Sequence, residues 1–541
     1  MSIVKSKVVG ISFLMMTGIL LNIVPIGRQN ARASVDEDIL TLNARSRMET
    51  SRGSGRFRVV SSQLEWKASE TTIIICDMWD RHWCKGATQR VAELAPYMNE
   101  VVCKARDKGV LIVHAPSGTV NHYKDYPARK RAQEAPKAGN LPNDIGGWCT
   151  WIDEGEKRTG YPIDHSDGGC DCESKCKQGS PWRKQIESIE IRKEDAISDS
   201  GAEIWNLLEE RGIKNVILMG VHTNMCVLGR PFGLRNMSRF GKKVVLMRDL
   251  TDTMYNSRAK PYVSHFTGTD LVVEHIERFV CPTITSTALT NQQPFCFRND
   301  KRQRVVFISA ESEYGADESL PEFAQELEMK YGFCCEIIQG STDRGSEERD
   351  YIVGMEALTN ADLVVLFVRR RAFPAKQMRY LRDYLEGGKP LIALRTSSHA
   401  FDTRGKHPDG HVEWRNFDPE VLGGNYHGHY GSGPTTTMKP AEGAEKHPIL
   451  AGVQTPFKSI SSLYQASPLT KSTRALLIGT IPGKGPEPAA WTNKYKRTRV
   501  FYTSLGNVDD FRNPQFLRLL INAVFWVMEK PVPKIKADIK K

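Results

Sequence analysis

Cys226 is the residue of this chain whose position best suits covalent chemistry. It lies in the segment NVILMGVHTNMCVLG, directly after an apolar run over residues 215–221 and at the start of an expected helix. A thiol at a helix N-terminus faces the positive end of the helix dipole, so we expect a lowered pKa and an available thiolate near neutral pH. Free backbone N–H groups in such a turn can also bind an oxyanion. A cysteine after a strand is also a common core residue, so its neighbours must decide its role.

Two charged residues are expected beside this thiol. Asp77 ends the apolar run TTIIICD, and Lys193 follows an expected strand over residues 186–191. Because the carboxyl ends of parallel strands meet at one edge of a sheet, both side chains are expected to flank Cys226. The carboxylate would take up the thiol proton, and the ammonium group would stabilise the thiolate. The sequence therefore predicts Asp77, Lys193 and Cys226 as catalytic residues.

Alternating strands and helices are expected to position these residues. In the first half, the expected strands cover 71–77, 110–115, 186–191, 215–221 and 243–248, and the expected helices cover 91–105, 202–211 and 269–279. In the second half, the expected strands cover 304–310, 334–339, 363–368, 391–395, 475–481 and 499–505, and the expected helices cover 320–331, 375–386 and 514–528. This alternation predicts an α/β protein with two three-layer αβα domains, each with a mainly parallel, doubly wound sheet.

Domain boundaries follow from composition. A polar stretch between the two halves predicts a linker, and each half is expected to fold on its own. The expected organisation is residues 1–33 as a leader, 34–69 as an N-terminal extension, 70–284 as the first domain, 285–302 as the linker, 303–533 as the second domain and 534–541 as a basic tail.

The leader has the pattern of a secretory signal peptide. Lys5 and Lys7 precede an apolar run over residues 8–26, and Ala31-Arg32-Ala33 is typical of a cleavage site. An uncleaved membrane anchor is the alternative, since the run could nearly span a bilayer. We expect cleavage before Ser34, no stable membrane span afterwards, and an exported protein, periplasmic or extracellular.

Net charge gives no sign of a nucleic-acid partner. The 541 residues carry a formal charge of +12, and residues 1–33 contribute four basic side chains and no acid, which leaves +8. The basic residues are scattered among acids, without an interleaved aromatic platform, so a solvated surface is expected.

Twelve cysteines in an exported chain permit disulfides. The densest group is Cys149, Cys170, Cys172 and Cys176, in a polar insertion rich in glycine. Its spacing lacks paired C-x2-C knuckles, which favours disulfides or free thiols over zinc, but zinc stays open.

Three segments of the first half resemble the isochorismatase-like hydrolase superfamily, which includes nicotinamidases and other amidases with an Asp-Lys-Cys triad. They are IIICDMWD, IEIRKEDAISDSGAEIWNLLEERGIKNVILMGVHTNMCVLG and KKVVLMRDLTD, within about residues 70–282. The resemblance implies a cis peptide before His222 and an oxyanion hole formed by the amides of His222 and Cys226. It implies attack of Cys226 on an amide carbonyl, although relatives that cleave vinyl ethers leave the bond open.

This chain departs from the pattern of those relatives at three places. Trp79 stands where many relatives have glutamine, and the spacing after Lys193 is short, so Arg192 is an alternative source of the positive charge. The segment HAPSGTVNH lacks the metal motif of nicotinamidases, so neither a metal nor another cofactor is expected. Trp79, His82 and His114 are candidates for the lining of the pocket.

The second half resembles the ThuA-like (trehalose-utilisation) family, which is related in fold to class I glutamine amidotransferases. The matching segments are RVVFISA, ADLVVLFV, LRDYLEGGKPLIALRTSSHAF and RTRVFYTSLGNVDDF. Where amidotransferases have a nucleophilic cysteine, this chain has Thr396-Ser397-Ser398-His399, so amidotransferase chemistry is not expected. Six of the 13 histidines lie between His399 and His447, in a long excursion between strands. Ser398, His399, His427 and His429 are therefore candidates for a second site, for a sugar or a metal, and structural histidines are the alternative.

Two functions follow from these expectations. The first is an exported cysteine hydrolase that cleaves a small amide through a thioester, with a ThuA-like domain of possible carbohydrate-related role. The alternative is a carbohydrate-binding or carbohydrate-processing protein in which the first half is a non-catalytic scaffold. The expected partner is in both cases a small molecule.

Overall fold

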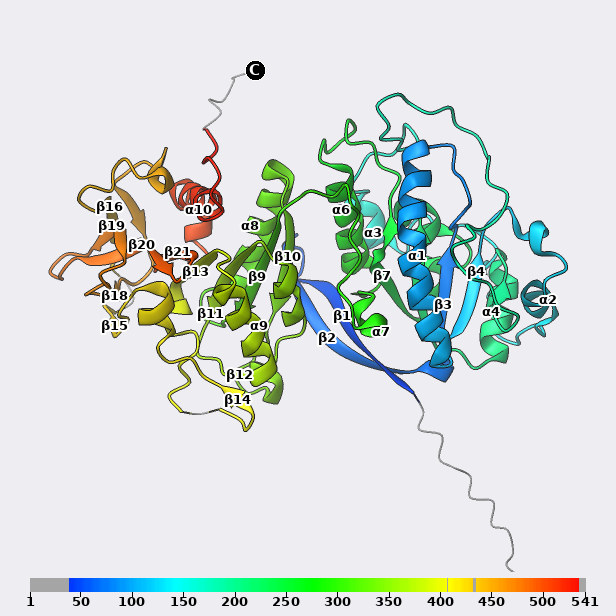
Figure 1. Cartoon of the computed structure of the whole chain (residues 1–541), viewed down its shortest axis with the longest axis horizontal. Helices are drawn as coiled ribbons and strands as arrows, with labels where there is room; N and C mark the ends of the chain where they lie inside the picture. Colours follow the sequence, from blue (N-terminus) through cyan, green and yellow to red (C-terminus); the bar gives the residue numbers. More distant parts are fainter. Residues whose placement is uncertain (1–37, 406, 432–433, 535–541) are drawn as a thin grey trace, which may run out of the picture. The chain divides into compact units, whose positions relative to one another are not determined.

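A computed structural model describes residues 38–405, 407–431 and 434–534 (Figure 1). The expected leader, 1–33, lies outside the described residues, as does the basic tail beyond Lys534. Within the described ranges, no helix is both long and apolar enough to span a membrane.

The first sheet contains eight strands. They are β1 (Ile39–Glu49), β2 (Phe57–Lys67), β3 (Thr71–Cys76), β4 (Leu111–Ala115), β5 (Ala196–Ile197), β6 (Asn215–Val221), β7 (Lys243–Asp252) and β8 (Thr283–Ile284). The order is β2-β1-β8-β7-β6-β3-β4-β5; β8 to β5 run parallel, and β1 and β2 are antiparallel additions. The helices in this part of the chain are α1 (Lys85–Asp107), α2 (Pro127–Glu134), α3 (Glu154–Thr159), α4 (Gly201–Glu210), α5 (Leu234–Arg239), α6 (His265–Phe279) and α7 (Thr287–Thr290).

Helices cover both faces of this sheet. Val91 and Leu94 of α1 pack with Ile73 of β3 on one face. Ile204 of α4 and Val272 of α6 pack with other strand residues on the opposite face. The strands are apolar on both sides because each face is buried, which is why they appear in the sequence as continuous hydrophobic runs.

The second sheet contains nine strands. They are β9 (Arg304–Ala310), β10 (Cys334–Gln339), β11 (Leu363–Val368), β13 (Leu391–Leu394), β16 (Thr436–Pro440), β17 (Phe457–Ser459), β19 (Arg474–Thr480), β20 (Glu487–Tyr495) and β21 (Thr498–Thr503). The order is β10-β9-β11-β13-β21-β20-β19-β16-β17, parallel from β10 to β21 and antiparallel beyond. The helices are α8 (Ala316–Tyr331), α9 (Ala375–Glu386) and α10 (Pro514–Val527), and two small ladders pair β12 (Phe373–Pro374) with β14 (His411–Val412) and β15 (Gly428–His429) with β18 (Tyr464–Gln465).

The second sheet is likewise buried on both faces. Leu320 of α8 and Leu519 of α10 pack on one face, and Leu381 of α9 packs on the other. Both large sheets are therefore mainly parallel with helices between their strands, and the α/β fold class is confirmed.

The expected strand over residues 186–191 is wrong. Ile186 donates its N–H to the carbonyl of Met78, and Ile189 turns back to the carbonyl of Ile186, so this segment forms a turn. The edge strand is instead β5, which begins three residues after Lys193 and pairs in parallel with β4. Lys193 therefore precedes a strand rather than following one.

The N-terminal extension and the linker both pack against the fold. Residues 39–67 form the hairpin of β1 and β2, and Arg45 of β1 pairs with Thr283 of β8. In the linker, Phe295 and Phe297 pack with the α1 face of the first sheet, while Arg298 extends into solvent with 90 % of its side chain exposed. Independent folding of the two halves stays a prediction.

Candidate functional site

Asp77 and Cys226 meet at the carboxyl edge of the first sheet. Asp77 follows β3 directly, and Cys226 lies in the helical turn Thr223–Val227 that follows β6, the strand paired with β3. The Cys226 thiol and the Asp77 carboxylate are close enough to influence each other's pKa, and both residues are buried. Asp77 has a φ of 49°, in the left-handed region that non-glycine residues seldom occupy, and such backbone is frequent at functional sites.

The cation at this site is Arg230, four residues after Cys226. Its Nη2 lies 3.1 Å from Asp77 Oδ2, and its guanidinium also interacts electrostatically with the Cys226 thiol. Asp77 Oδ1 accepts a hydrogen bond of 2.8 Å from the N–H of Ser117. The guanidinium is fixed from its other side by the Trp148 ring, 4.8 Å away. Arg230 was not singled out from the sequence, although its place one helical turn after Cys226 was a usable signal.

The structure does not bring Lys193 to this group. Lys193 is exposed, and its carbonyl oxygen accepts a hydrogen bond from Arg131. The reason is topological, since it lies before β5 and the carboxyl edge of a parallel sheet follows each strand. Arg192 also stays away and pairs with Glu190 at 3.0 Å.

The pKa of Cys226 is raised, contrary to the expectation from the helix dipole. Burial is the largest cause and the negative charge of Asp77 adds to it, while Arg230 and the backbone N–H of His222 oppose them. Burial also raises the pKa of Asp77, against the effect of Arg230. The resting thiol therefore keeps its proton, and attack requires proton transfer to Asp77.

The implied oxyanion donors lie in the same turn. The peptide bond between Val221 and His222 is cis, as the resemblance implied. The backbone N–H of His222 lies near the Cys226 thiol and partly offsets the rise in its pKa. The imidazole Nε2 of His222 is buried without a hydrogen-bond partner among the described residues. Burial lowers the pKa of His222 well below its ordinary value, so the ring is neutral.

Aromatic rings lie beside the turn. Trp79 stacks on Trp182 at 4.5 Å between centroids, His82 stacks on Trp182 at 5.7 Å, and the His82 ring meets the His222 ring edge-on at 4.8 Å. Burial lowers the pKa of His82 to about 4. Two of the three expected pocket residues, Trp79 and His82, therefore lie in this group, and Trp182 was missed.

His114, the third expected pocket residue, is a structural residue. It lies on β4 with no exposed surface, and its ring nitrogens contact Gln185 Oε1 at 3.0 Å and Asp195 Oδ2 at 3.2 Å. Asp195 also binds Arg106 at 2.9 Å. The ring ties β4 to the segment that precedes β5.

The second half has a cavity of about 560 Å³ that contains all four expected residues, Ser398, His399, His427 and His429. It lies beyond the carboxyl end of β13, where the turn Arg395–His399 begins. His399 is buried, contacts Ser398 Oγ through Nδ1 at 3.1 Å and stacks on Tyr426 at 4.5 Å. His427 and His429 are exposed and make short-range contacts with backbone carbonyls.

Asp418 lines the same cavity and was not predicted. Burial raises its pKa to about 7, because only the N–H of Tyr426, 2.7 Å from Oδ2, offsets the loss of water. Its Oδ1 has no hydrogen-bond partner among the described residues. Burial and nearby arginines, Arg370 first, lower the pKa of His399 to about 2. The cavity thus combines a neutral imidazole with a carboxyl group that titrates near neutral pH.

Arg395 is the first residue after β13 and begins the turn Arg395–His399. It follows β13 with a φ of 42°, and its guanidinium is almost fully buried. The guanidinium donates to the carbonyl of Ser504 and to Ser462 Oγ, and lies 4.0 Å from the Tyr314 ring centre.

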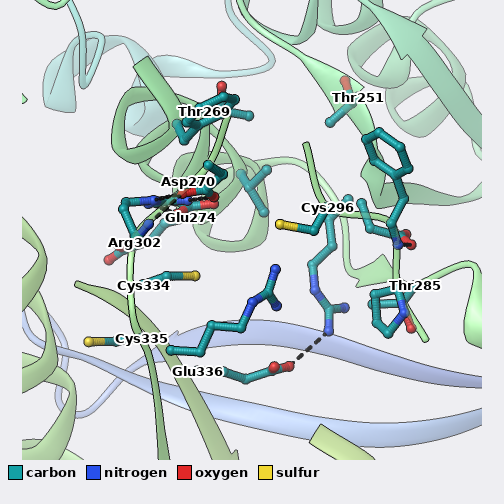
Figure 2. A pocket seen from close by; sticks show the side chains of 18 of the residues that line it. Thr251, Thr269, Asp270, Glu274, Thr285, Cys296, Arg302, Cys334, Cys335 and Glu336 are labelled. Carbon is teal, nitrogen blue, oxygen red and sulfur yellow. Dashed lines mark hydrogen bonds and ion pairs between the residues drawn. The ribbon is translucent and has the colours of Figure 1, made fainter. Parts of the chain in front are cut away.

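A smaller cavity of about 160 Å³ is lined by residues of β1, α6 and β10. Figure 2 shows side chains that line it. Its charges pair with one another: Arg302 contacts Asp270 at 2.6 Å, and Arg248 contacts Glu336 at 3.2 Å. This pairing explains its polar lining as internal packing, and none of the predicted site residues lies there.

Comparison with known proteins supports the predicted ThuA-like domain in the second half. The ThuA family, described as trehalose utilisation, matches residues 304–527. Among curated proteins, none matches the chain significantly.

Several solved structures are loosely similar to the chain. A putative ThuA-like protein from Parabacteroides merdae is 16% identical, covers 44% of this chain and 94% of its own, and has a TM-score of 0.34. The glutaminase domain of Trypanosoma brucei CTPS is 12% identical over 41% of this chain and 94% of its own, with a TM-score of 0.25. A β-galactosidase from Rahnella sp. R3 is 11% identical over 86% of this chain and 85% of its own, with a TM-score of 0.33. At such scores nothing about function follows from them.

Proposed function

We propose, on the premise that residues 304–527 form a ThuA-like domain, that the rest of this chain supplies a separate cysteine hydrolase for a small amide. One observation carries the proposal: Cys226, Asp77 and Arg230 contact one another at the carboxyl edge of the first sheet. A thiol beside a carboxylate and a cation is the set of groups that nucleophilic catalysis requires.

Each group has a step in the reaction. Asp77 takes the proton of Cys226 as the sulfur attacks the amide carbonyl carbon, and the carbonyl oxygen becomes an oxyanion beside the N–H groups of His222 and Cys226. Asp77 then gives this proton to the leaving amine as the C–N bond breaks and a thioester forms. Water then attacks the thioester carbonyl with Asp77 as base, the C–S bond breaks, and the leaving sulfur takes the proton from Asp77. The carboxylic acid product is released and the free thiol is regenerated.

Arg230 has an electrostatic task in this scheme. Its positive charge favours the ionised forms of both Asp77 and Cys226, which counters the burial that raises both pKa values. In this proposal Arg230 takes the role that the sequence assigned to Lys193. Export, expected from residues 1–33, remains part of the proposal and is tested by the intact mass of the secreted protein.

A thioester trap tests the hydrolase. The full chain is mixed with a panel of small primary amides, quenched in acid and analysed by intact and peptide mass spectrometry. An acyl adduct on Cys226 that accompanies ammonia release is the expected result. Cys226→Ala should lose both signals, whereas Cys281→Ala, which removes a similarly buried thiol (8 % exposed against 7 % for Cys226), should keep both. Full turnover by Cys226→Ala would contradict the proposal, and vinyl-ether cleavage without an adduct would replace the thioester route.

The cavity around Asp418 favours a second candidate function, the binding or processing of a carbohydrate. Its lining offers carboxyl, amide, imidazole and guanidinium groups, which suit a ligand with many hydroxyl groups. Calorimetric titration with trehalose and with monosaccharides tests it. Asp418→Asn should weaken binding at least tenfold, whereas Asp409→Asn, at an exposed position in the same excursion, should not. Equal binding by both variants would contradict this assignment.

A further inference from the structure

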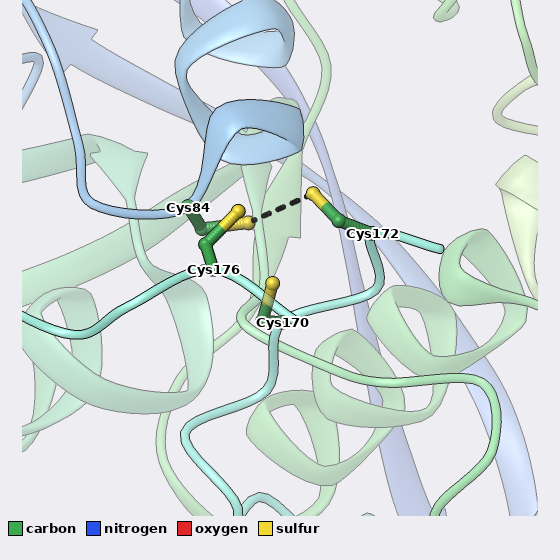
Figure 3. A group of neighbouring side chains, drawn as sticks. All are labelled: Cys84, Cys170, Cys172 and Cys176. Carbon is green, nitrogen blue, oxygen red and sulfur yellow. Dashed lines mark hydrogen bonds between the residues drawn. The ribbon is translucent and has the colours of Figure 1, made fainter. Parts of the chain in front are cut away.

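Four cysteine side chains converge next to the first site. Their sulfur atoms all lie within 4.8 Å of one another, and they belong to Cys84, Cys170, Cys172 and Cys176. Figure 3 shows the sulfurs pointing toward a common centre from the start of α1 and from the loop over residues 170–176. Among the described residues, this is the group found to offer three or more ligand atoms at such short range.

The membership of this group differs from the expectation. Cys149, which the sequence placed with the other three, donates instead to the carbonyl of Trp151 at 3.2 Å. Cys84 takes its place, as the residue that precedes α1. Cys84 and Cys170 are buried, and Cys172 and Cys176 are partly exposed, so the centre has protein on one side and can be reached from the other.

The sulfur spacing fits a metal centre better than a disulfide. All four thiols are free, and the Cys84 and Cys172 sulfurs are 3.7 Å apart. A disulfide needs about 2.05 Å between sulfurs. Four thiolates at about 2.3 Å from a tetrahedral zinc ion are about 3.8 Å from one another. The observed separation therefore matches an edge of that tetrahedron.

Backbone N–H groups donate to two of the four sulfurs. Gly86 donates to the Cys172 sulfur at 3.3 Å, and Lys85 donates to the Cys176 sulfur at 3.5 Å. Both donors are in the first turn of α1, whose dipole favours the negative charge of a metal–tetrathiolate group.

We propose that Cys84, Cys170, Cys172 and Cys176 bind one zinc ion as thiolates in a closed, structural site. Each thiol releases its proton to solvent as its sulfur binds the ion, so no oxidant is needed. Zinc is a d10 ion that accepts four thiolates in tetrahedral geometry without redox chemistry.

The position of the centre gives the ion a structural task. The cysteines pack against Met254 and against Met225, the residue before Cys226. Gly169, next to Cys170, is so close to Met254 that a Cβ atom there would lie 2.3 Å from the Met254 carbonyl. Asn224, in the turn of Cys226, donates to that same carbonyl at 3.0 Å. Zinc would thus fix the loop against the turn that carries the nucleophile.

Metal analysis of the purified full chain tests the site directly. We expect about one zinc per chain, retained after gel filtration in the presence of EDTA. Cys176→Ser should lower the zinc content roughly tenfold or more, because a structural site relies on all four ligands. Cys103→Ser, which changes a cysteine elsewhere on α1, should keep the full content. Chains without zinc in which Cys84 forms a disulfide with Cys172 would overturn the proposal, as would unchanged zinc content in Cys176→Ser.

If Cys176→Ser does not fold, cobalt substitution of the unsubstituted chain tests the zinc site without that variant. Unsubstituted chain reconstituted with Co²⁺ in place of zinc should show intense sulfur-to-cobalt charge-transfer absorption and the visible bands of tetrahedral cobalt. The spectrum of Cys103→Ser should be the same. Weak octahedral bands in the unsubstituted chain would overturn the tetrathiolate assignment. None of these readouts depends on hydrolase activity, so failure of the proposed function leaves this test intact.

Discussion

Replacing Arg230 by methionine should destabilise the fold through the charge left on Asp77. Asp77 is fully buried, and the two charged groups are 3.1 Å apart. With an effective dielectric constant of about 20, the attraction is 332/(20 × 3.1), or about 5 kcal/mol before desolvation. Removal of one partner of a buried pair costs about 3 to 5 kcal/mol. Because the Arg230 side chain is 23 % exposed, we expect the lower end, about 3 kcal/mol at pH 8.

The pH dependence gives this prediction its signature. Burial raises the pKa of Asp77 and Arg230 opposes that rise, so the pKa rises further in Arg230→Met. A carboxyl group whose pKa is higher in the folded than in the unfolded protein loses stability as pH rises through the folded pKa. The variant should therefore be closer to the unsubstituted protein at pH 5, where Asp77 can take up a proton, than at pH 8.

Urea unfolding at pH 5 and pH 8 measures the effect, with Arg230→Lys as the matched control that keeps the charge. Arg230→Lys should recover more than half of the loss at pH 8. Alkylation of Cys226 by iodoacetamide should slow in Arg230→Met, since a cation that favours the thiolate is gone. The same loss of stability at both pH values would refute the electrostatic reasoning and indicate lost packing against Trp148 instead.

Four other outcomes follow from the structure. The raised pKa of Asp418, about 7 against an ordinary 3.8, should lower the free energy of unfolding by up to about 4 kcal/mol as pH rises from 4 to 8, and Asp418→Asn should remove this dependence in urea titrations. Gly268→Ala should cost about 1 to 3 kcal/mol and lower the melting temperature, because the new Cβ would lie 2.2 Å from the ring of Tyr255. Lys193→Ala should leave the alkylation rate of Cys226 unchanged. A slower rate would show that Lys193 acts on the thiol and would contradict its placement away from the site. Brief trypsin digestion should cut first after Arg298, as read from fragment masses, and resistance there would argue against an accessible linker.

Some parts of the fold were predictable because their signals are local. The strands β3 and β6 are continuous apolar runs, and the residues that follow them, Asp77 and the turn of Cys226, were placed correctly on one sheet edge. The antiparallel strand β20 was missed because its sequence, EPAAWTNKY, contains a proline and two alanines that do not favour a strand. It forms because β19 and β21 pair with it on both sides.

Other features depended on distant residues. Lys193 was misplaced because a turn at residues 187–189 was interpreted as part of a strand. Cys84 could not be assigned to the cysteine group from sequence, since it lies 86 positions before Cys170 and only the packing of the loop on α1 brings them together. Asp418 was not predicted as a site residue because the burial that raises the pKa of its carboxyl group has no local sequence signal.

The hairpin of β1 and β2 sets a limit on how this protein can be divided for experiments. Arg56 of its turn contacts Glu322 of α8 at 3.0 Å, while Arg45 of β1 contacts Glu277 of α6 at 2.8 Å. A fragment that begins at residue 70, where the sequence suggests a boundary, would leave the edge of β8 unpaired. Glu277 would then be buried without Arg45 and Arg47, which pair with it. A fragment made of the first half should therefore retain residues 38–67, which pair with the first sheet. A fragment made of the second half alone would expose the part of α8 that the hairpin contacts.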